Sequence, residues 1–393
     1  MTDQLPMSGL KVFDATQGVA GPHSTMLLAQ YGADVIKIEP IDGDWGRTLG
    51  KTYEDFCAHA VALNRGKRSI ALDLKHEGGL GVAQRLARDA DIIVESFRPG
   101  VMGRFGLGYD DIVKDNPQVI YLSVTGFGQR GPRRDLPVTD AVIQAFSGLM
   151  SINRDVQGAP QRISMVAIDM ITGLYAYQAI ASAVLKRFRF GGGQYIDCSL
   201  MQSAAAFQAA KIAEHYLEGR TPQVLYVPVG TMRTRDGYLN VSAMREHHYV
   251  AMMKVIGKPE LATDPRFDTK EKRMENEAVL MPMVREAFLT RTTSEWSELL
   301  TKAGVMNSSV STYDDFMADP HVQAVDSLAW PQHQVVGKIP VPKIPGTEAI
   351  RGGPELLEAP RNGQHTETIL REAGYGDDEI ADLIETAAVM ARA

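Results

Sequence analysis

The first half of the chain alternates short apolar runs with segments of helical pattern, and this alternation constrains the fold more than any other feature. The runs rich in β-branched residues are LKVFDA (10–15), DVIKIE (34–39), DIIVES (91–96) and VIYLSVTG (119–126). Because they are apolar almost throughout, rather than at every second position, they predict parallel strands buried on both faces. The segments between them, such as 24–31 and 79–90, predict covering helices. We therefore expect an α/β fold with a doubly wound, Rossmann-like large domain.

Two long helical patterns follow the predicted sheet, at 170–187 and 199–217. In the first, apolar residues recur every three to four positions, which produces one broad apolar face. GGGQ at 191–194 predicts a turn between the two helices. The overlapping stretch 165–185 is apolar enough to resemble a membrane span, but it contains Asp169, and a charge inside a lone span is costly. We expect a buried helix of a soluble protein instead.

The residue pattern changes after Thr221-Pro222. A smaller α+β domain is predicted from a hairpin strand and three helical patterns, which cover 234–243, 246–256, 272–289 and 294–303. Prolines between 330 and 355 exclude helix and suit an extended linker. Two helices, expected at 365–372 and 377–389, are too short to fold alone and should pack on the large domain. The predicted parts are 1–224 (large domain), 225–325 (small domain) and 326–393 (linker and returning helices).

Composition argues against several classes of protein. The formal net charge is -7 and no long basic block occurs, whereas a nucleic-acid binder usually presents a basic face. The two cysteines, Cys57 and Cys198, form no CxxC pattern, so we expect neither a disulfide framework nor a zinc site. The first residues lack a basic flank followed by an apolar stretch, so no secretory signal is expected. These features predict a cytoplasmic protein with no membrane or nucleic-acid partner.

Familiar cofactor and hydrolase motifs are missing or out of context. GFGQRG (126–131) matches the dinucleotide fingerprint in letters, but Pro132 and Arg133 follow it, and the fingerprint must open a helix. A glycine loop at the end of a strand can still line a ligand crevice. His247 and His248 would diverge by about 100° on a helix and share an ion poorly. With no HExxH and no G-x-S-x-G present, neither a metal site nor a serine hydrolase is predicted.

Asp169 is the most informative single residue because apolar side chains flank it at a helix start. One interpretation is an N-cap, in which its carboxylate accepts backbone N–H bonds. The other is a nucleophile, a partly desolvated carboxylate able to attack an acyl carbon. Asp197 is also predicted to open a helix, with the cap interpretation alone.

Several sequence blocks together resemble one known family. The main blocks are GLKVFDATQGVAGPHSTMLLAQYGADVIKIEP (9–40), GDWGR (43–47), NRGKRSIALDLK (64–75), ADIIVESFRPGVMGRFGLGYDDI (90–112), NPQVIYLSVTGFGQRGP (116–132) and GGGQYIDCSL (191–200). DGYLNV (236–241), ADPHVQA (318–324) and GQHTETILREAGY (363–375) extend the match toward the C-terminus. In this order and spacing the chain resembles the class III CoA-transferases, the CaiB/BaiF family, over nearly its whole length.

The resemblance implies reversible transfer of CoA from an acyl-CoA to a free carboxylic acid. Asp169 matches the family nucleophile. Its carboxylate would attack the donor thioester, forming an acyl-aspartyl anhydride and releasing CoA thiolate. The thiolate would return to form an aspartyl-CoA thioester, which the acceptor carboxylate then attacks, and water must be excluded throughout. Coenzyme A is thus implied as a substrate, with no permanently bound cofactor.

The resemblance also implies where CoA and the acyl group bind. Positions that match family contacts or border the acyl site are Gln17, Val19, Ala20, Leu72, Asp73, Lys75, Ser96, Phe97, Arg98, Arg104, Thr139 and Asp140. Lys75 and Arg104 can meet phosphates, and Phe97 can stack on adenine. Without the resemblance, solvated charges and a core aromatic ring would be the simpler interpretation of these three. The family fold further implies a homodimer of two interlocked chains.

Departures from the family pattern bear on the substrate. Formyl-CoA transferases have glutamine directly before Ala-Gly-Pro, whereas this chain has Val19 there and Gln17 two residues earlier. Their Lys-x-Tyr-Glu run is replaced here by residues 137–140, and their glycine-rich lid is not found, which argues against oxalate or formate. Three arginines predicted in the small domain could receive a second carboxylate or simply face solvent: Arg233, Arg235 and Arg245. A dicarboxylate acceptor with succinyl-CoA as donor is the resulting hypothesis.

Two alternatives to CoA transfer stay open. An α-methylacyl-CoA racemase of the same fold would exchange a proton with a His-Asp arrangement, but its Gly-His-Asp run corresponds to Val138-Thr139-Asp140 here. The missing imidazole argues against racemisation. A non-catalytic CoA-binding protein would bind acyl-CoA without forming a covalent adduct.

Overall fold

The computed structural model describes residues 5–155, 157–219, 224–346 and 357–392. The chain divides into two compact units. The large unit comprises Met1–Ile212 and Leu328–Ala393, and the small unit comprises Ala213–Ser327. The small unit is therefore inserted into the sequence of the large unit, and each has its own hydrophobic core.

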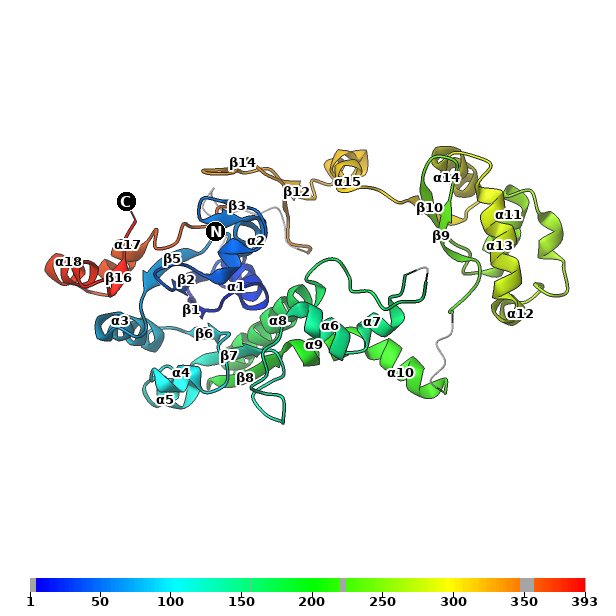
Figure 1. The fold of residues 1–393 in the computed structure, drawn as a ribbon. Coiled ribbons are helices and arrows are strands. Elements are labelled where there is room, and N and C mark those ends of the chain that lie inside the picture. The colour runs from blue at the N-terminus through cyan, green and yellow to red at the C-terminus, as the bar shows by residue number, and fades with distance from the viewer. Residues whose placement is uncertain (1–4, 156, 220–223, 347–356, 393) are drawn as a thin grey trace. The chain divides into compact units, whose positions relative to one another are not determined.

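A seven-stranded sheet forms the centre of the large unit (Figure 1). Its strands are β1 (Lys11–Ala15), β2 (Asp34–Glu39), β5 (Arg68–Leu72), β6 (Ile92–Glu95), β7 (Ile120–Thr125), β8 (Gln194–Ser199) and β16 (Val389–Met390). Six run parallel in the spatial order β5-β2-β1-β6-β7-β8, and β16 is antiparallel to β5 at one edge. Numbered along the chain, the parallel strands have the order 3-2-1-4-5-6 of a doubly wound sheet. The predicted α/β fold with a parallel sheet is confirmed.

Strands β1, β2, β6 and β7 coincide with the four apolar runs. The prediction that GGGQ is a turn between two helices is wrong, because strand β8 begins at Gln194. The chain passes from α8 into β8 before the next helix begins. The backbone N–H groups of Gly193 and Gln194 donate to the carbonyls of Pro117 and Val119, both at 3.0 Å, which aligns this segment with β7. A Cβ at Gly193 would collide with the Val119 carbonyl. The glycines thus permit close approach to a neighbouring strand rather than a simple reversal.

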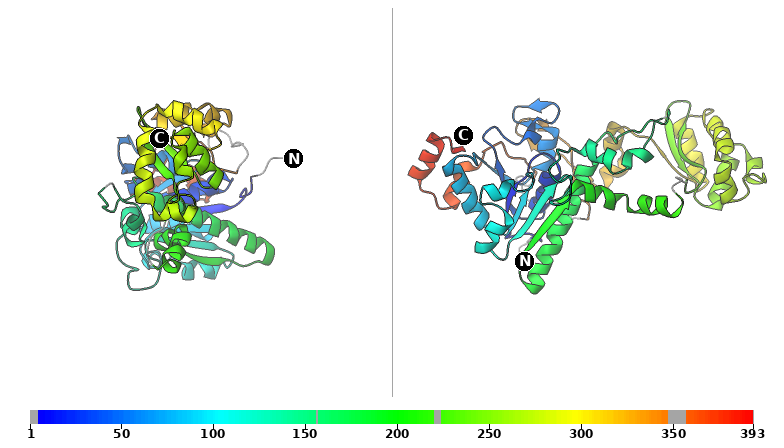
Figure 2. Two further views of the ribbon diagram at one scale, coloured as in Figure 1. Left: turned by 90° about the vertical axis from the view of Figure 1, so that its right-hand side faces the viewer. Right: turned by 60° about the horizontal axis from the view of Figure 1, so that its bottom comes forward.

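Helices cover both faces of the sheet (Figures 1 and 2). One face packs against α1 (Ala20–Gln30), α6 (Asp140–Phe146), α8 (Ala167–Phe190) and α9 (Leu200–Phe207). The other packs against α3 (Glu77–Arg88), α4 (Val101–Arg104), α5 (Tyr109–Asp115), α17 (Thr366–Glu372) and α18 (Asp377–Glu385). Strand residues alternate between the two cores: Val94 and Leu122 face the first, while Ile93 and Tyr121 face the second.

Helix α8 is the one helix among the described residues that is long and apolar enough to cross a membrane. Its inner face contributes Ile168, Ala176 and Ile180 to the core beside α1. Gly173 permits this packing, since a Cβ there would lie 2.5 Å from His23 Nδ1. Its outer face leaves Leu174 and other apolar side chains exposed.

The second long helical pattern, expected over 199–217, is divided into α9 and α10 (Ala209–Leu217). Ser199 caps α9 by accepting a hydrogen bond from Gln202 N at 3.2 Å. The prediction that Asp197 opens this helix is wrong, because Asp197 lies within β8 and its carboxylate accepts from Gln129 N at 3.0 Å.

The small unit contains an antiparallel sheet of β9 (Val229–Arg233), β10 (Tyr238–Ser242) and β11 (Met306–Ser309). Its principal helices are α11 (Glu246–Val255), α12 (Lys270–Glu275), α13 (Glu277–Phe288) and α14 (Thr293–Lys302). The single helix expected over 272–289 is two helices that meet at Asn276. Trp296, Tyr249 and Phe288 fill the core, where Trp296 Nε1 donates to the Phe288 carbonyl at 2.8 Å.

The chain returns to the large unit at Leu328, and short strands within 328–342 are the first elements of this returning segment. Residues 347–356 of the proline-rich stretch lie outside the described residues. The last expected helix ends at Glu385 rather than 389, because the following residues form β16, in which Val389 pairs with Leu72. Thr366 Oγ1 donates to the Met390 carbonyl at 2.7 Å and so joins α17 to this added strand.

Candidate active site

A cavity of about 550 Å³ lies in the large unit at the carboxyl ends of β1, β6 and β7. This is the point where the strand order reverses, between β1 and β6, and ligands of doubly wound folds bind in that crevice. Gln17 follows β1, the 96–99 loop follows β6, and β7 ends at Thr125, directly before Gly126. Asp169 enters the same cavity from the first turn of α8.

The carboxylate of Asp169 does not cap its helix, so that interpretation is wrong. Asp169 is the third residue of α8, whose N-cap is Val166. Among the described residues, none donates a hydrogen bond to the Asp169 side chain. The carboxylate that accepts the helix N–H groups belongs instead to Asp140: its Oδ2 receives Ile168 N at 2.6 Å and Asp169 N at 3.0 Å. Asp169 is thereby left free for chemistry.

Asp140 is itself held firmly from the other side. Only 4% of its surface is exposed, and it is the first residue of α6. Gln144 Nε2 donates to Asp140 Oδ1 at 2.6 Å, while Gln144 Oε1 accepts from Ile163 N at 2.8 Å. A buried hydrogen-bonded chain therefore joins α6, the segment before α8, and the first turn of α8.

The electrostatic environment of Asp169 disfavours its ionised form. Burial, followed by the neighbouring Asp140 charge, raises the pKa of Asp169 to about 7, and the His59 imidazole opposes this rise. His59 lies at the start of α2 (Ala58–Leu63), and a hydrogen bond with Cys57 raises the pKa of His59. Its Nδ1 is buried and has no hydrogen-bond partner in the described part of the chain. A carboxylate whose pKa is raised by burial and by a neighbouring charge inside a cavity is a candidate catalytic group.

A second histidine, on α1, anchors the helix that contains Asp169. His23 Nδ1 donates to the Met170 carbonyl at 3.0 Å, and only 6% of His23 is exposed. Burial lowers the pKa of His23 to about 4, so the ring is neutral at physiological pH. His23 therefore serves as a hydrogen-bonding support for α8.

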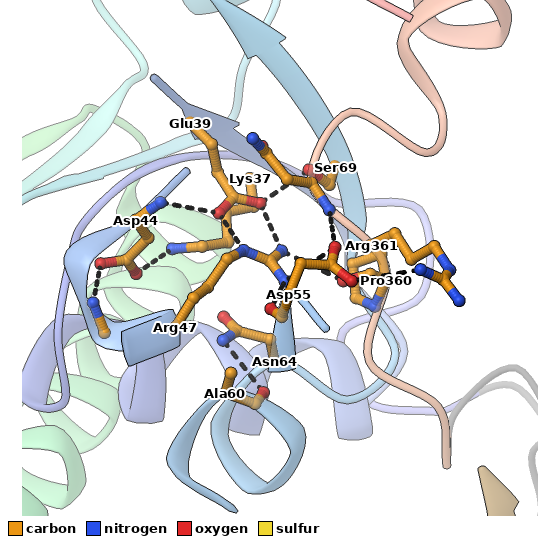
Figure 3. Close-up of polar contacts among 12 residues, drawn as sticks. Lys37, Glu39, Asp44, Arg47, Asp55, Ala60, Asn64, Ser69, Pro360 and Arg361 are labelled. Carbon is orange, nitrogen blue, oxygen red and sulfur yellow. Dashed lines mark hydrogen bonds and ion pairs between the residues drawn. The ribbon is translucent and has the colours of Figure 1, made fainter. Parts of the chain in front are cut away.

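The loop after β2 forms another wall of the cavity, with Trp45 and Leu49, and buried ion pairs fix it (Figure 3). Asp44 Oδ2 pairs with Lys37 Nζ at 2.9 Å, and Asp44 Oδ1 accepts from Gly18 N at 2.9 Å. Arg47 makes two hydrogen bonds with Glu39, each 2.7 Å long. Separating the partners of a buried ion pair would leave each charge buried without a partner, which is energetically costly. We therefore expect this wall of the cavity to be rigid.

The structure brings most of the predicted contact residues together and leaves four outside the cavity. Those lining it are Gln17, Val19, Ala20, Ser96, Phe97, Arg98, Thr139, Asp140 and Asp169. Leu72, Asp73, Lys75 and Arg104 do not line it. The Leu72 side chain is in the core, and Asp73 Oδ1 accepts from Lys75 N at 2.8 Å in a turn at the carboxyl end of β5. That turn lies on the same edge of the sheet as the cavity but beyond β1 and β2.

The sequence analysis did not predict several of the residues that line the cavity. They include Trp45, Leu49, Arg134, Leu136 and Arg162. Trp45 belongs to the GDWGR block, but nothing in that block connects the indole with the site. Gly126 of the GFGQRG loop does line the cavity, which agrees with a strand-end loop at a ligand crevice.

The positive charge at the cavity comes from arginines of the large unit. Arg98 and Arg162 line the cavity and have no ion-pair partner among the described residues, whereas Arg134 pairs with Asp135 at 3.2 Å. Arg233, Arg235 and Arg245, considered above as carboxylate receptors, belong to the small unit. Within the described residues, no group of three or more His, Cys, Asp or Glu could hold a metal ion.

Comparison with known proteins identifies the family. The model of CoA-transferase family III matches residues 7–366. Human succinyl-CoA:glutarate CoA-transferase is 35% identical, and the alignment covers 99% of this chain and 91% of the human protein. The succinate–glutarate CoA-transferase of Agrobacterium fabrum is 32% identical, with 93% of this chain and 95% of that protein covered. The crystal structure of a CaiB/BaiF family protein from Brucella suis superimposes with a TM-score of 0.84 at 31% identity, covering 94% of this chain and all of that one. The chain belongs to CoA-transferase family III and is a CoA-transferase.

Proposed function

We propose that this enzyme moves CoA from an acyl-CoA donor to a free carboxylic acid through covalent intermediates on Asp169. The observation that carries the proposal is the Asp169 carboxylate, which lines a cavity at the switch point of the sheet and has no hydrogen-bond or ion-pair partner among the residues that the structure describes. A structural aspartate at a helix start would accept backbone N–H bonds, but here Asp140 takes that role. Asp169 is therefore available as a nucleophile.

The proposed steps conserve atoms and charge. An Asp169 oxygen bonds to the thioester carbonyl carbon, the C–S bond breaks, and CoA leaves as the thiolate with a mixed anhydride remaining. The thiolate then attacks the Asp169 carbonyl carbon, which releases the donor acid and forms the aspartyl-CoA thioester. The acceptor carboxylate attacks the carbonyl carbon of this thioester, the C–S bond breaks, and CoA thiolate leaves with an acceptor-aspartyl anhydride remaining. The thiolate then attacks the acceptor's acyl carbon, which forms the product acyl-CoA and regenerates the Asp169 carboxylate. No metal or redox group takes part in these steps.

We further propose succinyl-CoA as donor and a short dicarboxylic acid as acceptor. The names of two relatives refer to succinate or succinyl-CoA and to glutarate. Arg98 and Arg162 support the assignment, because each lines the cavity that contains Asp169 and has no ion-pair partner in the described part of the chain. The CoA chain would run from this cavity along the sheet edge, where Lys75 and Arg104 would meet phosphates and Phe97 would stack on adenine.

A homodimer in the cytoplasm, with no permanently bound cofactor, completes the proposal. Apolar side chains are exposed along α8 and α10: Leu174, Leu185, Phe188, Phe190, Ile212, Tyr216 and Leu217. A second copy of the chain would bury them. Both cysteines are free thiols, which suits a reducing compartment.

The test is intact-mass measurement after brief incubation with succinyl-CoA, acetyl-CoA and other donors. In a parallel sample, hydroxylamine converts the thioester to a hydroxamate, which releases CoA and marks the acylated peptide. Wild type should gain a CoA-sized mass that maps to the peptide containing Asp169, whereas Asp169→Ala should gain none and still bind CoA. Asp115→Ala, which removes an exposed carboxylate, is the control and should behave as wild type. Measurable CoA binding without an adduct for any donor would contradict the proposal.

A further inference from the structure

Asp140 affects Asp169 in two ways, through hydrogen bonds to its backbone and through the charge of its own carboxylate. It accepts the two N–H groups that open the first turn of α8, and its carboxylate is close enough to Asp169 for the two charges to interact. We propose that Asp140 is the positioning residue of the nucleophile and that its fixed negative charge favours the covalent intermediates over the free enzyme. This inference rests on the proposed function, because it concerns the steps in which Asp169 is acylated.

The positioning part follows from the hydrogen bonds. Asp140 Oδ2 receives Asp169's own backbone N–H at 3.0 Å and that of Ile168 at 2.6 Å. Oδ1 is held by Gln144 Nε2 at 2.6 Å, so the carboxylate has little freedom to rotate. Because all these atoms are in one buried chain, displacing Asp140 would displace the Cα from which the nucleophile projects.

The electrostatic role of Asp140 follows from the charge of Asp169, which is negative as a free carboxylate and zero in the covalent intermediates. As a free carboxylate, Asp169 forms a like-charged pair with Asp140 in a partly dehydrated site. As an anhydride or a thioester, Asp169 is neutral, and the repulsion is gone. Asp140 thus destabilises the resting carboxylate relative to both covalent states. Protonation of Asp169 removes the same repulsion, so acylation and protonation should respond equally to the charge of Asp140.

Other charges near the site act in the opposite direction. The His59 imidazole interacts with Asp169 from α2, and Arg98, Arg134 and Arg162 line the same cavity. Asp140 is the negative group that raises the pKa of Asp169. Asp140 also accepts hydrogen bonds from the backbone of the turn that contains Asp169. Different substitutions of Asp140 can therefore separate the effect of its charge from the effect of these hydrogen bonds.

The experiment compares Asp140→Asn with Asp140→Ala. The asparagine variant keeps an oxygen for the α8 N–H groups but loses the charge and the oxygen that accepts from Gln144 Nε2, whereas alanine loses all three. The ratio of aspartyl-CoA enzyme to free enzyme is measured by intact mass at about pH 8.5, where Asp169 is ionised, with fixed succinyl-CoA and succinate. The pH dependence of adduct formation is measured in parallel. Asp115→Asn controls for removal of an exposed negative charge.

For Asp140→Asn we expect the covalent-to-free ratio to fall about tenfold and the acid limb of the pH profile to move down by about one unit. The two changes should agree in size. For Asp140→Ala we expect an additional loss of kcat of about tenfold or more, with KM for the donor nearly unchanged. An asparagine variant with a wild-type ratio and pH profile would overturn the electrostatic role. An alanine variant no slower than asparagine would overturn the positioning role.

Failure of the inference is distinguishable from failure of the proposed function. If wild type forms no adduct, the function itself is wrong. If wild type forms the adduct and Asp140→Asn matches it in both measurements, only the role of Asp140 is wrong. Should either variant unfold, Gln144→Ala releases the Asp140 carboxylate while keeping its charge, and it should lower kcat without moving the acid limb by as much as Asp140→Asn does.

Discussion

The indole ring of Trp45 lies directly against the backbone of Gly18, so that a Cβ at position 18 would collide with the ring. Gly18 also has a φ of +81°, which L-residues with side chains seldom adopt. Replacing Gly18 with alanine should therefore displace Trp45 from the cavity wall. We expect the KM for acyl-CoA to rise several-fold and the free energy of unfolding to fall by about 1–3 kcal/mol. Steady-state kinetics and thermal unfolding would measure both.

Gly9→Ala is the matched control for this substitution. Gly9 has a φ of +86°, but a Cβ at this position would meet nothing within 4 Å, so the substitution introduces only backbone strain. It should lower stability and leave the KM for acyl-CoA unchanged. Equal effects of the two variants on KM would show that Trp45 does not shape the site.

Asp169→Asn should stabilise the folded protein while it abolishes transfer. The folded-state pKa of Asp169, about 7, lies above its ordinary value of 3.8, so ionisation in the folded state costs stability as the pH rises between these values. Asparagine removes that cost, by on the order of 3 kcal/mol at pH 8 and less at pH 5. Denaturant unfolding at both pH values would measure the gain. A gain independent of pH would contradict the raised pKa.

His59→Gln should move the acid limb of adduct formation to higher pH. The imidazole lowers the pKa of Asp169, so its loss leaves more of the Asp169 carboxyl protonated at any pH near neutrality. The direction is opposite to that expected for Asp140→Asn. Adduct formation followed from pH 5 to pH 9 would reveal the shift, and His247→Gln, an exposed histidine of the small unit, provides a control without effect. A limb that stays in place would remove His59 from the electrostatics of the site.

Arg162→Ala should weaken binding of substrates that carry a second carboxylate. The KM values for glutarate and succinyl-CoA should rise about tenfold, whereas that for acetyl-CoA should change little, because Arg162 lines the cavity without an ion-pair partner among the described residues. Arg235→Ala is the comparison, since Arg235 belongs to the small unit and lies 3.7 Å from Glu295. If Arg235→Ala had the larger effect on glutarate, the assignment of Arg162 would fail.

Strands whose own residues form an apolar run could be predicted from the sequence. Strands that depend on pairing with a segment far away in the sequence could not. β6 and β7 are short continuous apolar runs, and the structure buries every residue of each. β8 has the mixed sequence QYIDCS and is only partly buried, so its strand character depends on pairing with β7, about 70 residues earlier in the chain. The two residues of β16 are a strand because α17 and α18 bring them to β5.

The same distinction explains the site. Apolar flanks around Asp169 pointed to an unusual carboxylate, and the family resemblance agreed. The sequence around Asp169 could not show that its helix is capped by Asp140, because the hydrogen bonds connect residues 28 and 29 positions apart. His59 was not predictable for the same reason: its interaction with Asp169 exists only once α2 and α8 have packed into one unit.

The pairing of β16 with β5 has a consequence for how the protein is made. The edge of the central sheet is completed by residues 389–390, after the whole small unit has been translated. A nascent chain on the ribosome can therefore fold the small unit as a continuous segment while β5 still presents an open edge. Until residues 389–390 have been synthesised and have paired with β5, that edge is available to other strands. Chaperone protection during synthesis is therefore expected to matter more for the large unit than for the small one.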